Sequence, residues 1–277
     1  MSWWQEIPYR IDPIIVEFGS LQIRYYGMMY LVALATVYAL VRYRLQREEY
    51  PYTNQAVEDV LIWGMLGMII GARLGDALFY NFSYFALRPW EIFLPFTWEN
   101  GALRFVGFSG MSYHGGFIGA FVAFFLYCRA QKIAFLHFAD LFIPAIPLGY
   151  TFGRIGNFIN GELFGRETTV SWGMYFPLDP SMTLRHPSQL YEAFFEGIFL
   201  FIILWLLRTK IKTAGALLAL YIIGYGAVRF FIEFFREPET GFIAGPLTMG
   251  QLLCLLMIFV GAILLTYLTR RKSGDVN

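Results

Sequence analysis

Charged residues are scarce in this chain. Of its 277 residues only 15% are charged and 57% are hydrophobic, whereas a soluble domain averages about 25% charged residues. This shortage excludes an ordinary soluble domain and predicts a protein that crosses a membrane several times. The net charge is +1, so the chain also lacks the basic excess that a nucleic-acid partner requires.

Cysteine is also rare, and no leader sequence is expected. The two cysteines, Cys128 and Cys254, both fall within apolar runs, which argues against a disulfide framework or a zinc site. The chain starts MSWWQEIPYRIDP, with no basic segment followed by an apolar stretch. We therefore expect no cleavable signal peptide.

Long apolar runs are abundant. A helix needs about 20 apolar residues to cross a bilayer, and runs approaching that length predict seven spans. They are Tyr26–Val41, Val60–Phe82, Met111–Cys128, Phe138–Phe152, Gln189–Leu207, Ala214–Phe235 and Met249–Leu268. We expect an all-α polytopic membrane protein that forms one integral domain over residues 1–277, with small periplasmic segments around 84–110 and 167–187.

The distribution of lysine predicts the orientation. The connections after the first, third, fifth and seventh runs hold 11 of the 21 basic residues and all four lysines. Because basic loops tend to stay in the cytoplasm, we expect a periplasmic N-terminus and a cytoplasmic C-terminus. The ten other basic residues are all arginines, and arginine forks onto phosphate and carboxylate groups.

One polar stretch stands directly after the fourth apolar run. Residues 153–166 read GRIGNFINGELFGR, and so close to lipid these polar side chains must be paired, hydrated or bound to a ligand. With the expected orientation, further polar side chains reach the same face of the membrane. These are Arg24, Tyr26, Arg73, Asp76, Ser112, His114, Arg185, His186, Arg229 and Glu233. Their convergence predicts a site at the outer leaflet.

Several of these residues also have a plain structural interpretation. Arg229 and Glu233 are four residues apart and could form an ion pair within one helix. Tyr26 could be an interfacial aromatic residue, and His186, which precedes a proline, suits the entry to a helix. His114 stands beside two glycines at the mouth of a span, where a chemical and a structural role are both open.

The stretch GRIGNFINGELFGR resembles the signature of the bacterial prolipoprotein diacylglyceryl transferases. Four other segments resemble the family in the same order, over nearly the whole chain. They are YYGMMY (Tyr25–Tyr30), YHGG (Tyr113–Gly116), RHPSQLYE (Arg185–Glu192) and RFFIEFFREP (Arg229–Pro238). The stretches Tyr84–Gly110 and Glu167–Leu184 fit the family only loosely, and we expect no catalytic role there.

The resemblance implies an enzyme of the bacterial cytoplasmic membrane with its site toward the periplasmic leaflet. Such enzymes transfer the diacylglyceryl group of phosphatidylglycerol to the thiol of a lipobox cysteine in a prolipoprotein. The products are a thioether and glycerol phosphate. No metal or organic cofactor is expected, because the phospholipid is already activated.

The same chemistry suggests roles for the matching residues. Arg154 and Arg229 would stabilise the departing phosphate, and His114 would take the thiol proton. Tyr26 is a further catalytic candidate. Arg154 and Arg229 are also expected to bind phosphatidylglycerol, together with Asn157, Asn160, Glu162, Gly165, Glu233 and Arg73.

Two functions from other classes stay open on the residues alone. A transporter or channel also has polar groups inside a helical bundle, although its charges would gather at the midplane and an inverted repeat would be expected. A scaffold or receptor that binds anionic lipid without turnover would use the arginines but leave His114 unexplained. Product formation on a lipobox peptide separates the enzyme from both.

Overall fold

The computed structural model describes residues 2–18, 21–94, 96–99, 102–105, 110–237, 243–244 and 247–274. This part of the chain is mostly helical, as a multi-pass membrane protein should be. Five helices in it are long and apolar enough to cross a membrane. They are Tyr25–Arg47, Asn54–Tyr80, Phe135–Ile159, Ser188–Leu207 and Met249–Arg271, and Ala216–Ile232 is a shorter apolar helix. The third expected span forms a helix but is not among these, so seven spans stay a prediction.

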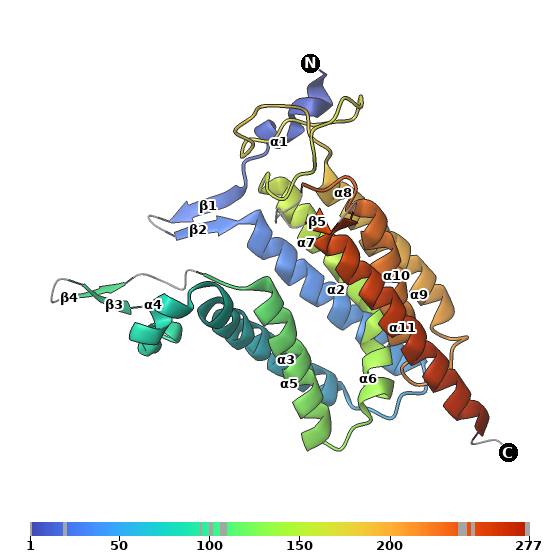
Figure 1. Ribbon diagram of the computed structural model, residues 1–277. Helices are drawn as coiled ribbons and strands as arrows, with labels where there is room; N and C mark the ends of the chain where they lie inside the picture. Colours follow the sequence, from blue (N-terminus) through green and yellow to red (C-terminus); the bar gives the residue numbers. More distant parts are fainter. Residues whose placement is uncertain are drawn as a thin grey trace. The chain divides into compact units, whose positions relative to one another are not determined.

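Figure 1 shows the elements in chain order. The helices are α1 (Ile7–Arg10), α2 (Tyr25–Arg47), α3 (Asn54–Gly75), α4 (Phe82–Leu87), α5 (Tyr113–Ala130), α6 (Phe135–Phe142), α7 (Ile146–Ile159), α8 (Ser188–Glu192), α9 (Leu200–Leu207), α10 (Ala216–Ile232) and α11 (Met249–Gly274). Short 3-10 turns are η1 (Trp3–Glu6), η3 (Pro89–Ile92) and η4 (Ile143–Ala145), and π-helical segments are η2 (Asp76–Tyr80) and η5 (Ala193–Phe199).

Within the described residues, three short antiparallel hairpins accompany the helices, where the sequence predicted none. They are β1 (Ile14–Phe18) with β2 (Leu21–Arg24), β3 (Phe96–Glu99) with β4 (Ala102–Phe105), and β5 (Ile243–Ala244) with β6 (Leu247–Thr248). The β3–β4 hairpin lies within the expected segment 84–110, parts of which lie outside the described residues, as does Pro238.

The chain divides into two compact units, and each is considered by itself. The first unit comprises residues 1–50 and 139–277, and the second comprises residues 51–138. A single integral domain over the whole chain therefore stays a prediction.

Helix α7 lies within the first unit, packed against α2 on one flank and η5 on another, while α10 packs against α11. Small residues make these approaches close. A Cβ on Gly149 of α7 would lie 2.7 Å from a methyl group of Val37. A Cβ on Gly197 of η5 would lie within 2 Å of the Thr151 hydroxyl. The packing thus fixes the faces of α7 that carry the polar motif.

Two buried charged side chains, Arg44 and Asp140, connect the elements at the expected cytoplasmic end of this unit. Helix α2 continues to Arg47, so Arg44 belongs to the helix and not to a basic loop, and its side chain is fully buried. It donates to the carbonyls of Asp140 and Leu141 and pairs with Glu48 at 2.7 Å. The carboxylate of Asp140 accepts from the amides of Gly215 and Leu218, and so caps the first turn of α10.

In the second unit, α3 and α5 pack through glycine. A Cβ on Gly115 of α5 would lie 2.3 Å from the carbonyl oxygen of Gly71, and one on Gly119 would lie 2.1 Å from that of Gly67. The backbones can approach this closely only without side chains. Gly71 and Gly115 therefore permit the close packing of these two helices.

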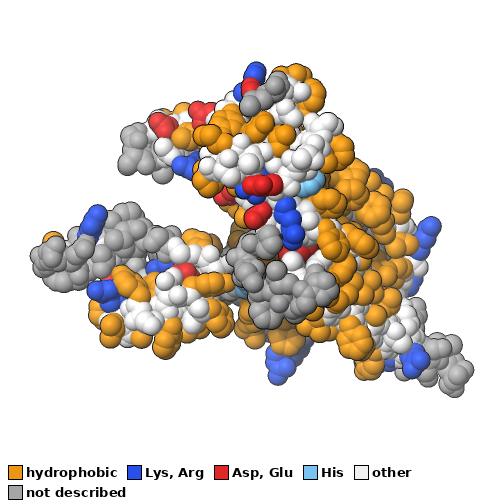
Figure 2. All heavy atoms as spheres, turned by 45° about the horizontal axis from the view of Figure 1, so that its top comes forward, with side chains coloured by type: hydrophobic (Ala, Val, Ile, Leu, Met, Phe, Trp, Pro, Cys, Tyr) orange, Lys and Arg blue, Asp and Glu red, His pale blue; other side chains and the backbone are white. Residues whose placement is uncertain are grey.

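The outer surfaces of the helices are apolar. Figure 2 shows hydrophobic side chains over much of one face of the molecule, with Lys, Arg, Asp and Glu side chains in small separate groups. Exposed examples include Ile62, Leu66 and Ile69 on α3, and Phe259 and Ile263 on α11. Apolar surface of this extent suits contact with lipid chains and not with water.

The glycine contact between α3 and α5 gives a direct test of the packing. We expect Gly115→Ala to destabilise the protein by about 1–3 kcal/mol, because the new methyl group would overlap the backbone of α3. Thermal unfolding in detergent measures the effect. Gly64→Ala, on the partner helix α3, is the matched control, since its Cβ would meet no atom within 4 Å. Equal stability of the two variants would contradict the packing.

Candidate active site

The polar motif at residues 153–166 begins inside a helix. Gly153 to Ile159 form the last turns of α7, whereas the sequence placed the whole stretch beyond a span. The helix ends at Ile159, and the turn after it passes through Gly161, whose φ of +68° is easily adopted only by glycine. The amide of Gly161 bonds to the carbonyl of Phe158, and that of Glu162 to the carbonyl of Asn157. This is a Schellman ending, and it turns the Glu162 side chain back toward α7.

The turn after α7 is held from the start of α8. Leu163 has a φ of +57°, a conformation that costs of order 1 kcal/mol or more for a branched side chain. Its carbonyl accepts a hydrogen bond from the hydroxyl of Ser188, and the carbonyl of Glu162 accepts one from the side-chain amide of Gln189. Both donors are fully buried. The RHPSQLYE segment therefore fixes the GRIGNFINGELFGR segment.

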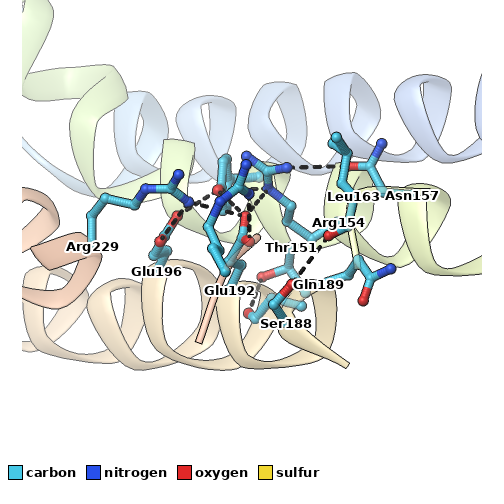
Figure 3. A network of polar contacts seen from close by, with 12 residues as sticks. Thr151, Arg154, Asn157, Leu163, Ser188, Gln189, Glu192, Glu196 and Arg229 are labelled. Carbon is cyan, nitrogen blue, oxygen red and sulfur yellow. Dashed lines mark hydrogen bonds and ion pairs between the residues drawn. The ribbon is translucent and has the colours of Figure 1, made fainter. Parts of the chain in front are cut away.

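Arg154 lies at the centre of the resulting polar network (Figure 3). Its Nε lies 2.8 Å from the carboxylate of Glu192 and 2.6 Å from the hydroxyl of Tyr150. Its Nη1 donates to Asn157, which in turn donates to Glu162 at 2.9 Å. Asn160 donates to the same oxygen of Glu162 at 3.3 Å. Asn157 and Glu162 thereby orient Arg154.

Glu192 connects three guanidinium groups. Its side chain is completely buried, and it pairs with Arg154 at 2.8 Å, Arg236 at 2.7 Å and Arg229 at 3.4 Å. These arginines come from α7, from the C-terminal half of α10 and from the chain just after α10. A buried carboxylate is tolerated only with such pairing. Glu192 therefore brings Arg154 and Arg229 together, as the sequence predicted for those two residues.

A second buried carboxylate follows one turn later. Glu196 lies in the π-helical segment η5, a geometry that often marks functional sites. Its Oε2 makes a short hydrogen bond with the Tyr150 hydroxyl, and its Oε1 lies 3.6 Å from Nη1 of Arg229. The hydroxyl of Thr151 bonds to the carbonyl of Ala193 at 3.1 Å, which fixes η5 against α7.

Arg229 and Glu233 form the ion pair that their spacing allowed, at 3.1 Å. Glu233 also accepts a hydrogen bond from Thr248, which ends β6 directly before α11, so the pair connects the end of α10 to the chain that enters α11. Arg229 keeps 17% of its side chain exposed. The pair has a structural role, and it leaves Arg229 accessible.

Two other candidates in this unit contact α7 or the chain that follows it. The ring of Tyr26 lies 3.0 Å from where a Cβ on Gly156 would stand, and its hydroxyl bonds to that of Tyr30. A Cβ on Gly165 would lie 2.2 Å from the carbonyl oxygen of Phe235. Glycine at position 165 thus permits close approach of the protein backbone.

His114 and Arg73 belong to the second unit. His114 is exposed at the second position of α5, where the side chain of Ser112 caps the helix by accepting from the Gly115 amide. Arg73 is buried and donates to the carbonyls of Glu91, Ile92 and Gly110. These bonds give Arg73 a clear structural role in holding that segment. The roles of both residues toward substrate stay predictions.

Sequence reasoning missed four residues of this network. Glu192, Glu196, Tyr150 and Arg236 were not among the expected site residues, although all four contact the two principal arginines or Glu192. The available signal was the pair of glutamates four residues apart in an apolar run. Ionisable residues inside a membrane span are functional candidates by default.

The arrangement suits recognition of an anionic group. Nη2 of Arg154 makes no hydrogen bond to the rest of the described residues, and Arg154 keeps 15% of its side chain exposed. Arginines held by carboxylates in this way are preorganised donors for phosphate oxygens. Across the described ranges, no group of three or more His, Cys, Asp or Glu residues is placed to hold a metal ion.

Comparison with known proteins identifies the family. A family model described as "Prolipoprotein diacylglyceryl transferase" matches residues 13–267. The chain belongs to this family. Three relatives carry the name phosphatidylglycerol–prolipoprotein diacylglyceryl transferase. That of Chlorobaculum tepidum is 53% identical over 99% of this chain and 96% of its own length. Those of Bordetella avium and Wolinella succinogenes are 44% and 42% identical, over 96% and 99% of this chain and 97% and 99% of their own lengths.

The loop between α7 and α8 is held at one further point. Arg185 pairs with the buried carboxylate of Asp179 at 2.8 Å and with Glu237 at 3.1 Å. Burial alone would raise the pKa of Asp179, but hydrogen bonds from Arg185 and Ser181 outweigh it and lower the pKa to about 2. This pair therefore stabilises the part of the chain that leads into α8.

The lowered pKa predicts how the loop responds to acid. The carboxylate of Asp179 stabilises the fold fully above its ordinary pKa of 3.8, and this contribution is lost as the pH falls to about 2. We expect cleavage of residues 167–187 by pepsin to increase over that window. Asp179→Asn should be cleaved readily even at the upper end of this pH window, near pH 3.8. Glu167→Gln, which alters an exposed partner 3.7 Å from Arg185, is the control. A cleavage profile for Asp179→Asn matching the wild type would contradict the assignment.

Proposed function

We propose that this protein transfers the diacylglyceryl group of phosphatidylglycerol to the thiol of the lipobox cysteine in prolipoproteins, the first step of lipoprotein maturation. The observation that carries the proposal is the full-length match to transferases named for this reaction, at 42–53% identity. The buried arginine network supports it independently, because the donor lipid is anionic. A membrane protein with long apolar helices also has direct access to a lipid substrate.

The reaction exchanges a carbon–oxygen bond for a carbon–sulfur bond. The substrate thiolate attacks the glyceryl carbon that bears the phosphodiester, and the bonding electrons leave with the phosphate oxygen of glycerol phosphate. Negative charge therefore grows on phosphate in the transition state. Guanidinium groups fixed beforehand lower the barrier most when their contacts strengthen at this moment. We assign this role to Arg154 and Arg229.

The remaining residues of the α7 motif hold these groups or meet the lipid headgroup. Asn157 bonds directly to Arg154, and Glu162 fixes Asn157, so their main role is to orient the arginine. Asn160 donates to Glu162, and we assign its Oδ1, which has no hydrogen-bond partner among the described residues, to accept from a glycerol hydroxyl. Glu233 positions Arg229. Gly165 acts by letting the backbone pack closely. Arg73 acts by stabilising the second unit.

The thiol must lose a proton before it can attack. We assign the proton to His114, because imidazole accepts protons near neutral pH and the side chain is exposed at the start of α5. Tyr26 packs on the same α7 face that carries Gly156, and its hydroxyl is a candidate for guiding the substrate.

We place the active site at the periplasmic leaflet of the bacterial inner membrane, with the N-terminus outside and the C-terminus inside. Within the first unit, Arg229 lies toward the C-terminal end of α10, whereas Lys210 and Lys212 precede its first turn. The arginine network and the lysines thus lie toward opposite ends of one helix. Lysine-rich ends stay cytoplasmic, which supports a periplasmic site.

Transfer to a peptide tests the proposal directly. Purified protein is incubated with phosphatidylglycerol and a synthetic lipobox peptide, and the peptide is weighed by mass spectrometry. We expect the cysteine to gain the mass of one diacylglyceryl group. A peptide whose cysteine is replaced by serine is the control. Lipid binding without any mass gain would favour the lipid-binding scaffold instead.

Replacing Arg154 tests the phosphate assignment. Arg154→Lys keeps the charge, but one ammonium group cannot bond to Glu192, Tyr150 and Asn157 and also present a free donor. We expect kcat/KM to fall about a hundredfold, equivalent to about 3 kcal/mol, while the protein still inserts. Arg10→Lys alters an exposed pair with Glu6 and should leave turnover unchanged. Wild-type turnover by Arg154→Lys would make Arg154 purely structural.

Replacing His114 tests the proton acceptor. His114→Asn should lower turnover by about 10²–10⁴, with little effect on phosphatidylglycerol binding. Raising the pH should recover part of the loss, because a free thiol with a pKa of about 8.5 then ionises unaided. His137→Asn, which changes a residue bonded to Tyr52, serves as control. A pH–rate profile of His114→Asn parallel to that of the wild type rules out the base assignment.

A further inference from the structure

The hydroxyl of Tyr150 has more acceptors around it than its single hydrogen can serve. Its oxygen lies close to Oε2 of Glu196 and 3.3 Å from Oε2 of Glu192. Nε of Arg154 donates to the same oxygen at 2.6 Å. A phenol supplies one hydrogen and accepts through its lone pairs. If both glutamates were ionised, one carboxylate oxygen would face a Tyr150 lone pair with no hydrogen between them.

One of the two carboxyl groups must therefore supply a second hydrogen for the contacts with the Tyr150 oxygen. Glu192 is not suited to supply it. Its Oε1 accepts from Arg236, and its Oε2 faces two cations, 2.8 Å from Nε of Arg154 and 3.4 Å from Nη1 of Arg229. Glu196 is different. Its Oε1 is buried and has no hydrogen-bond donor within the described ranges, and its nearest cation, Arg229, is 3.6 Å away. Two carboxyl groups this close, on one buried helix face, do not ionise equally.

We infer that Glu196 is held as the neutral acid and donates its proton to Tyr150, which in turn donates to Glu192. Every contact around the Tyr150 oxygen then has one hydrogen. Tyr150 accepts from Arg154 and Glu196, and gives its own hydrogen to Glu192. The relay positions Tyr150 and, through it, Nε of Arg154.

The neutral acid also sets the charge of the network. Three arginines (Arg154, Arg229 and Arg236) face three glutamates (Glu192, Glu196 and Glu233), and Tyr30, Tyr150, Tyr225 and Cys254 are further titratable neighbours. Glu162 lies beyond Asn157. If Glu196 is neutral, the directly paired groups carry one excess positive charge. That charge matches the single negative charge of a phosphodiester, so this step rests on the function proposed above.

Matched glutamine substitutions separate the two glutamates. Glu196→Gln replaces the O–H donor by an N–H donor, and we expect it to retain more of the wild-type kcat/KM than Glu192→Gln does. Glu192→Gln places a donor against two arginines, and kcat/KM should fall at least a hundredfold. Glu196→Ala, which removes the donor, should lose activity that Glu196→Gln retains. A Glu196→Gln variant as impaired as Glu192→Gln would overturn the inference.

An infrared measurement tests the protonation state without the reaction. The spectrum of the wild-type protein minus that of Glu196→Gln should show the C=O band of a carboxylic acid. A carboxylate band in its place would overturn the inference whatever the activities. If the wild type gave no peptide product but showed the acid band, the proposed function would fail while the neutral Glu196 would stand.

Discussion

A carboxylate removed from water has to be matched by positive charge and hydrogen bonds, since its desolvation costs several kcal/mol. Glu192 is such a group in the first unit. No part of its side chain is exposed, and its ion pairs draw in α7, the end of α10 and the chain beyond α10. Removing either side of such a buried pair typically costs about 3–5 kcal/mol. The positions of these elements depend on that one carboxylate.

The constraint extends outward from the ion pairs through the backbone. Arg236, fixed by Glu192, carries the segment that pairs with Gly165 and bonds to Arg166. This segment therefore packs against the chain that follows the turn after α7. Ser188 and Gln189 hold the same turn from α8. The donors that would meet a phosphate are therefore set before substrate arrives, which is what electrostatic catalysis requires.

Much of this could be predicted from the sequence, and what could not has physical causes. Apolar runs locate the spanning helices because the bilayer fixes their length, and Arg154 with Arg229 stood out against the lysine distribution. Glu192 and Glu196 were overlooked because they lie within an apolar run that predicts a spanning helix, and the sequence does not show which arginines pair with them. Arg44 was assigned to a basic loop because charge count ignores burial. Hydrogen-bonded hairpins as short as β5–β6 carry no clear pattern of their own.

The central claim is that the guanidinium of Arg154 binds the lipid phosphate, and solid-state NMR can measure this distance. Protein labelled with ¹⁵N in its arginines is reconstituted with phosphatidylglycerol, and dephasing between ³¹P and the guanidinium nitrogens is recorded with and without Arg154→Lys. The account predicts strong dephasing in the wild type, with a component that disappears in Arg154→Lys. Identical dephasing in the two proteins would contradict it.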